Sequence, residues 1–107
     1  MPYTTSPLLK EKFPDARLSW DLERLCADLT TIKQKPLSPT ELVCLQALLC
    51  GLDPKEIAVM LNRQIQGLRV DLTRGVYRYV SALTVAQVKN WRDVALLLER
   101  SGYKKHL

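Results

Sequence analysis

The sequence predicts an all-α fold, a small helical domain of about five helices, from three observations. Of the 107 residues, 47% are hydrophobic and only four are glycine, a composition typical of a folded helical chain. Apolar residues recur at three- and four-residue spacing from Leu18 onward, and no run alternates with period two. Two helix-start motifs stand fifteen residues apart near the middle of the chain.

The two start motifs are SPTE at residues 38–41 and DPKE at residues 53–56. In each motif the first side chain caps a helix, proline takes the first helical position, and glutamate reaches back to the cap. Gly51 supplies the left-handed residue that ends the first of these helices. A helix, a glycine turn and a short second helix form the front half of a helix-turn-helix. That unit most often places the next helix in the DNA major groove.

We expect helices over residues 19–34, 39–50, 54–61, 65–82 and 90–101. Ser19 is the expected cap of the first helix, and Asn90 that of the last. The apolar face of the first helix carries Leu18, Leu22, Leu25, Cys26, Leu29 and Ile32. The second is apolar around most of its circumference, so it should be the central, buried helix. The inward stripe of the fourth is Ile65, Leu68, Leu72, Val76 and Tyr79.

Residues 1–17 carry three prolines without periodicity, so we expect a flexible N-terminal arm followed by one helical domain over 18–107. The net charge of +5 and the pI near 9.3 allow a nucleic-acid partner without demanding one. No apolar run approaches the ~20 residues of a membrane span, and we expect a cytoplasmic protein without a membrane partner.

Metal, cofactor and enzyme chemistry are not expected. The three cysteines (Cys26, Cys44 and Cys50) lie in predicted helices without a C-x-x-C pair, and the one histidine is His106. A zinc site needs about four well-spaced ligands, so these thiols are better explained as reduced, buried side chains. The chain has no phosphate-cradling glycine loop and no nucleophile–base pair.

The functional prediction depends on the side of helix 65–82 opposite its apolar stripe. That side carries Gln66, Gly67, Val70, Arg74, Tyr77, Arg78 and Ser81, with Arg69 and Thr73 on one flank and Asp71 on the other. The four arginines of this region (Arg63, Arg69, Arg74 and Arg78) suit phosphate oxygens and guanine edges. Gln66 suits an adenine edge and Val70 a thymine methyl. A solvated, inert face is the other explanation for these arginines.

Two residues of this helix complicate the prediction. The Asp71 carboxylate repels phosphate unless it pairs with Arg74 one turn further on. Gly75 costs about 1 kcal/mol relative to alanine inside a helix. We therefore expect Gly75 to mark a bend or a close helix crossing.

Residues 37–61 resemble, without gaps, the pattern LSPxExxxLxxLxxGxxxKEIAxxL that opens the LuxR/FixJ-type (GerE-like) helix-turn-helix domain. The following residues match the family's recognition helix more loosely, with Gly67 and Asp71 in place of its threonine and histidine. The resemblance implies that Arg69, Val70 and Thr73 face bases and that Lys55 and Arg74 face phosphates. The segments RGVYRYV and NWRDVALLLERSGY are also similar to helix-turn-helix modules at the N-termini of large cyanobacterial signalling and conflict ATPases. In those proteins the unit is expected to recruit partners.

Two functions follow from these patterns. The first is a bacterial, nucleoid-associated transcriptional regulator that binds double-stranded DNA. We expect it to bind as a homodimer, because one such unit buries too little surface for tight specific binding. The second is an adaptor that keeps the fold but binds a protein instead of DNA. Helices 19–34 and 90–101 are candidates for the dimer surface, although most of each apolar stripe is expected to complete the monomer core.

Overall fold

The computed structural model describes residues 19–105, which contain only helices and no named strand. The helices are α3 (Leu22–Lys33), α4 (Pro39–Leu49), α5 (Pro54–Met60), α6 (Ile65–Arg74), α7 (Val76–Thr84) and α8 (Trp91–Arg100). The all-α prediction is therefore confirmed over this range. The predicted arm at residues 1–17, together with Leu18 and His106, lies outside the described residues.

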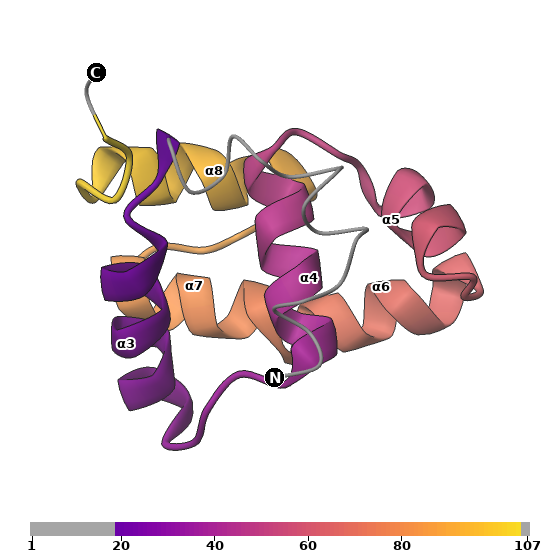
Figure 1. Cartoon of the computed structure of the whole chain (residues 1–107), viewed down its shortest axis with the longest axis horizontal. Helices are drawn as coiled ribbons and strands as arrows, with labels where there is room; N and C mark the ends of the chain where they lie inside the picture. The colour runs from indigo at the N-terminus through magenta and orange to yellow at the C-terminus, as the bar shows by residue number, and fades with distance from the viewer. Residues whose placement is uncertain (1–18, 106–107) are drawn as a thin grey trace.

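Helix α4 passes through the middle of the molecule, with α3 on one side and α5 and α6 at the opposite end (Figure 1). Every residue from Cys44 to Leu49 is buried, which confirms the prediction of a central helix. The Ser38 hydroxyl accepts a hydrogen bond from the Glu41 backbone N–H at 3.1 Å, and the Glu41 carboxylate accepts one from the Ser38 N–H at 2.9 Å. Gly51 ends the helix with φ of 91°, as predicted.

The second start motif is also confirmed. The Asp53 carboxylate accepts from the Glu56 N–H at 2.8 Å, and Glu56 accepts from the Asp53 N–H at 3.0 Å. Asn62 follows α5 in the left-handed conformation, with φ of 53°, and a turn at residues 61–64 leads into α6. The local capping residues thus define where α4 and α5 begin and end.

The first helix begins later than predicted, at Leu22, with Asp21 rather than Ser19 as its cap. The reason is that residues 19–21 pair with the C-terminal end of the domain. The Asp21 N–H donates to the Tyr103 carbonyl at 2.8 Å, and the Lys105 N–H donates to the Ser19 carbonyl at 2.7 Å. Trp20 and Tyr103 are buried by this pairing, and helical periodicity did not predict either as a core residue.

The prediction of one helix over 65–82 is wrong, because Gly75 divides it into α6 and α7. A Cβ atom at Gly75 would lie 2.9 Å from the Asp71 carbonyl oxygen and 3.1 Å from Glu41 Oε2. A glycine here lets the start of α4 approach the junction closely, and the chain makes its break at that point. The expected bend and close crossing are both present.

The break also changes which side chains of α7 face inward. Val80 is fully buried in the position predicted for Tyr79, which is half-buried. Tyr77 and Ser81 were predicted on the exposed side, but both are half-buried. The Ser81 hydroxyl donates to the Tyr77 carbonyl at 2.8 Å and accepts from the Val88 N–H at 3.0 Å, which ties the loop before α8 to α7.

The outer helices mainly complete the core. α3 buries Leu25 and Leu29, and α8 buries Val94 and Leu98. Asn90 caps α8 by accepting from the Arg92 N–H at 2.9 Å, as predicted. None of the helices described here has the length and apolar character needed to cross a membrane.

The cysteines differ in their surroundings more than the sequence predicts. Cys44 is buried and Cys26 is half-buried, but Cys50 is exposed. Cys50 follows the last turn of α4 as its C-cap, so it lies outside the helix that was predicted to contain it. Burial raises the pKa of the Cys44 thiol to about 11, which keeps this side chain neutral and unreactive.

Candidate nucleic-acid interface

Helix α6 forms an exposed ridge at one end of the molecule, beside α5 (Figure 1). It buries only Leu68 and Leu72, with Ile65 half-buried, and the rest of its residues are exposed. Every predicted contact residue is exposed, namely Lys55, Arg63, Gln66, Arg69, Val70, Thr73, Arg74 and Arg78. The ridge is therefore accessible to a large partner along its length.

One flank of α6 borders a groove of about 350 Å³, which we call the cationic groove. Its lining residues are Asp53, Pro54, Lys55, Arg69, Thr73, Tyr77, Asn90 and Trp91. Within residues 19–105, neither Lys55 nor Arg69 has a carboxylate within ion-pair distance. The one acid of the groove, Asp53, caps α5 through the Glu56 N–H. The groove thus presents two unpaired cations and one capped carboxylate.

The other flank of α6 borders a cavity of about 400 Å³, which we call the paired cavity. Its lining residues are Lys33, Ser38, Thr40, Glu41, Arg63, Asp71, Arg74, Gly75 and Tyr79. Two ion pairs cross it, Lys33 with Glu41 and Arg63 with Asp71, the second at 2.6 Å. Among the described residues Arg74 has no ion-pair partner, so it supplies the unpaired charge of this flank.

The Lys33–Glu41 pair joins α3 to the start of α4. Partial burial of the Glu41 carboxyl raises its pKa, but hydrogen bonds from Lys33 and from the Ser38 backbone, with the Lys33 charge, outweigh that effect. The net result is a Glu41 pKa below its ordinary value. Glu41 therefore stays ionised beside the α6–α7 junction, where it holds the wall of the paired cavity.

The partner of Asp71 is not the one predicted. Asp71 pairs with Arg63 rather than with Arg74, since the turn at residues 61–64 brings Arg63 back over the start of α6. The Arg63 guanidinium also lies 3.6 Å from the position of a Cβ on Gly67. The ion pair compensates the Asp71 charge on the ridge, and it holds Arg63 in place.

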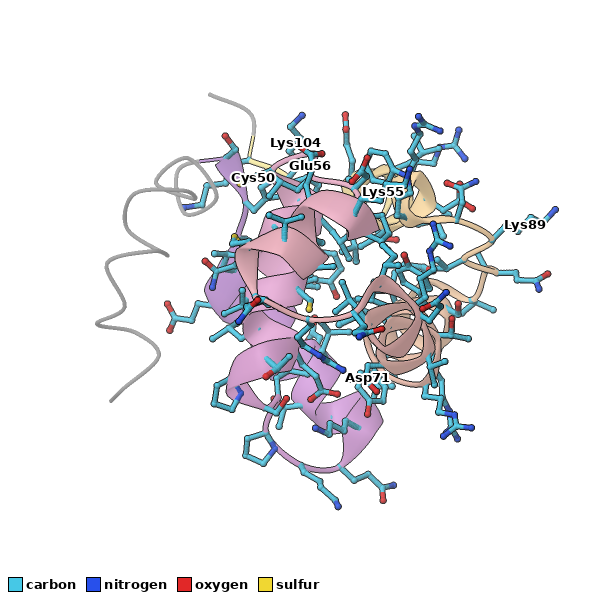
Figure 2. The ribbon with its side chains drawn as sticks, turned by 90° about the vertical axis from the view of Figure 1, so that its right-hand side faces the viewer. Cys50, Lys55, Glu56, Asp71, Lys89 and Lys104 are labelled. Carbon is cyan, nitrogen blue, oxygen red and sulfur yellow. The ribbon has the colours of Figure 1, made fainter. Side chains whose placement is uncertain are left out.

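The predicted residues are brought together in three groups. Lys55, Arg69 and Thr73 share the cationic groove, Arg63 and Arg74 share the paired cavity, and Gln66 and Val70 belong to the exposed ridge. Lys55 and Asp71 lie well apart on this end of the molecule, Lys55 toward the top of the view in Figure 2 and Asp71 in its lower half. Arg78 belongs to α7, beyond the break at Gly75.

Five residues of the cationic groove were not predicted as contacts. Asp53 and Pro54 were predicted only as the start of a helix, and the other three are Tyr77, Asn90 and Trp91. Tyr77 was predicted on the outer side of the helix, and its spacing of four residues from Thr73 is the signal that places both beside the same groove. Asn90 and Trp91 come from α8, far along the chain. No local pattern indicates that the start of α8 packs beside α5 and α6.

Between Ser19 and Lys105, no group of three His, Cys, Asp or Glu side chains is arranged to hold a metal ion. Comparisons of the chain with models of protein families, with curated proteins and with solved structures find no match. The geometry of α6 and its two flanks is therefore the basis for a functional proposal.

Proposed function

We propose that this protein is a DNA-binding transcriptional regulator that reads duplex DNA through α6. One observation carries the proposal. The exposed helix α6 lies between the cationic groove and the paired cavity. Each flank carries cations without an ion-pair partner in the described part of the chain: Lys55 and Arg69 on one side, and Arg74 on the other. Such a regulator acts in the cytoplasm, on the nucleoid.

The dimensions of DNA suit this arrangement. The major groove is about 12 Å wide and admits one α-helix, whose diameter with side chains is about 10–12 Å. A helix in the groove has a phosphate backbone beside each flank, within reach of Arg69 and Arg74. Gln66 and Val70 on the ridge then face base edges, an amide for adenine and a methyl-bearing side chain for thymine. Asp71 opposes this binding less than its charge suggests, because Arg63 neutralises it.

The dimensions of the protein allow binding as a homodimer. The domain measures 31 × 29 × 25 Å, whereas one turn of DNA spans about 34 Å. Two copies can therefore lie on the same face of the duplex with their α6 helices one turn apart. A second copy adds the contact area that a single small domain lacks for tight specific binding.

The test is the fluorescence anisotropy of labelled random and genomic duplexes, titrated with protein between about 50 and 200 mM salt. We expect affinity to fall steeply with salt, because phosphate contacts release counterions. The double substitution Arg69→Ala/Arg74→Ala should weaken duplex binding roughly tenfold or more. It should also lower the slope of log affinity against log salt concentration by about two.

The matched control for this titration is Arg100→Ala. Arg100 is exposed at the C-terminal end of α8, on the side of the molecule away from α5 and α6 (Figure 1). This variant should bind like the wild type. A folded wild-type protein that binds no duplex at about 50 mM salt would contradict the proposal.

A second candidate function, a protein-binding adaptor, is favoured by one specific observation. Val59 on α5 is 82% exposed and Val70 on α6 is 47% exposed. Exposed apolar side chains beside arginines also suit the centre of a protein interface. The same titration separates the two functions, because an adaptor shows absent or salt-insensitive duplex binding.

A further inference from the structure

The cationic groove contains more hydrogen-bond donors than its two cations. Tyr77 and Trp91 line it, and neither the phenol nor the indole donates a hydrogen bond within the described part of the chain. The Asn90 side-chain oxygen accepts from the Arg92 N–H, and its amide nitrogen donates to no acceptor among the described residues. The groove is thus lined by donors from α5, α6, α7 and the start of α8.

Two oxygen-bearing side chains of the groove, Asp53 and Thr73, each make one hydrogen bond within the protein. The capping oxygen of Asp53 is engaged by the Glu56 N–H at 2.8 Å. The Thr73 hydroxyl donates to the Arg69 carbonyl at 2.9 Å, which fixes its hydrogen inside α6. The other lining residues offer ammonium, guanidinium, phenol, indole and amide donors, and this set complements an anion with several oxygen atoms.

The surroundings of Trp91 and Tyr77 are compatible with hydrogen-bond donation by both rings. The Arg92 guanidinium lies 4.8 Å from the centroid of the Trp91 ring, so a cation stacks on this ring. Burial, with a smaller effect from Cys44, raises the pKa of Tyr77 to about 12 against the opposing charge of Arg69. The Tyr77 phenol therefore keeps its proton and can donate it in a hydrogen bond.

We propose that the cationic groove holds consecutive phosphates of one DNA strand, with Lys55 and Arg69 as charged contacts and Tyr77 and Trp91 as neutral donors. This inference rests on the proposed DNA-binding function and deepens it. The strand is the one that borders the major groove on the Lys55 side of α6. Helix α8 then extends the interface beyond α5 and α6, because Trp91 reaches the same groove.

The position of the groove supports a DNA strand as its occupant. The groove opens along the flank of α6 that carries Arg69 and Thr73, next to Lys55 at the start of α5. A backbone beside an inserted helix runs along such a flank, and its charge matches the excess of cations over carboxylates there. The opposite flank is less suited, because two of its three cations are already paired.

The test uses Tyr77→Phe and Trp91→Phe, which remove one donor each and keep an aromatic ring. Each should weaken duplex binding by roughly tenfold or more, the loss of one hydrogen bond to a charged group. The salt slope should stay at its wild-type value, since a neutral donor displaces no counterion, whereas Lys55→Ala should lower it by about one. Arg100→Ala is again the control, because Arg100 lies at the C-terminal end of α8, away from both flanks of α6 (Figure 1).

Tryptophan fluorescence provides a direct readout of groove occupancy. The chain has two tryptophans, and Trp20 is only 4% exposed. Added duplex should therefore change the emission of Trp91, and the change should be absent in Trp91→Phe. Inorganic phosphate at the same phosphate concentration should not reproduce it.

The outcomes separate this inference from the proposed function. If the wild-type protein binds duplex while Tyr77→Phe and Trp91→Phe bind equally well, the groove assignment is overturned and the function stands. An unchanged Trp91 emission at saturating duplex overturns the assignment in the same way. An equal emission change with inorganic phosphate alone would make the groove a free-anion site and overturn the strand as its occupant. If the folded wild type binds no duplex, both proposals fail.

Discussion

Val85 has a backbone conformation that β-branched residues rarely adopt. It ends α7 with φ of 52° and ψ of 42°, in the left-handed region. Its side chain is 91% exposed, so packing does not offset the strain, which for such a residue is of the order of 1–2 kcal/mol. Asparagine tolerates this region much better.

We therefore expect Val85→Asn to raise the free energy of unfolding by about 0.5–1 kcal/mol, measured by urea denaturation. The control is Val59→Asn, because Val59 is also highly exposed but lies in the right-handed backbone of α5. Its change should stay within about 0.5 kcal/mol. Equal effects of the two substitutions would show that the gain at Val85 does not come from the backbone.

At the scale of single residues, the caps and the glycine stop of the helix-turn-helix were predicted correctly. The caps Ser38 and Asp53 and the left-handed Gly51 were predicted from neighbours three or four residues away. Val85 was not, because valine itself gives no signal for a left-handed residue. Tyr77 was predicted on the exposed side but is half-buried, because α8 packs against α7 and its start shares the cationic groove with Tyr77.

At the scale of the element, two glycines of the α6 region have opposite roles. Gly75 lies against the Asp71 carbonyl and the Glu41 carboxylate, and a Cβ there would come within 2.9 Å of the carbonyl oxygen. Gly67 lies in the first turn of α6, and the nearest atom to its Cβ position is the flexible Arg63 guanidinium at 3.6 Å. One glycine is required by close packing, and the other only weakens its helix.

Gly75→Ala should lower the free energy of unfolding by about 1–3 kcal/mol, because the backbone carbonyl and Glu41 must both move. Gly67→Ala should instead raise it by up to about 1 kcal/mol, the difference in helix propensity. Thermal or urea unfolding of the two variants and the wild type measures the sign of each change in the free energy of unfolding. Stabilisation by both substitutions would contradict the close approach at the α6–α7 junction.

The elements were predictable to within a few residues, and so was the junction of α4 and α5, but the start of α3 and the complete break between α6 and α7 were not. The periodicity of residues 65–82 continues through Gly75, so the pattern alone indicated one helix. The start of α3 was placed too early because Ser19 is a good capping residue, whereas the structure uses it in pairing with Lys105. Local propensity was overridden at both places by contacts with distant segments.

At the scale of the whole molecule, the two ends of the described chain are joined. The Tyr103 hydroxyl donates to Asp28 at 2.6 Å, and Arg24 donates to the Gly102 carbonyl at 2.6 Å while its guanidinium stacks on the Tyr103 ring. These contacts hold α3 and the end of α8 together, far from the ridge formed by α6. The body of the domain thus lies to one side of α5 and α6, which form the opposite end of the molecule (Figure 1).

Neither the contacts between α3 and the end of α8 nor the cationic groove could be predicted from the sequence. Both depend on residues that are distant along the chain, Asp28 with Tyr103 in one case and Lys55 with Trp91 in the other. The sequence predicted the exposed contact residues of α6, because helical periodicity assigns each residue to a face. It did not predict the hollows beside them, because these are formed by the packing of separate helices.

The most direct test of the central claim, that α6 is a DNA-reading helix, is an amide NMR titration of the wild-type protein with a duplex. We expect shift changes over residues 65–74, at the start of α5 and around Trp91, and little change in α3 or at residues 102–105. Changes confined to α3 and the C-terminal end of α8 would contradict the account, and so would the absence of any change at low salt.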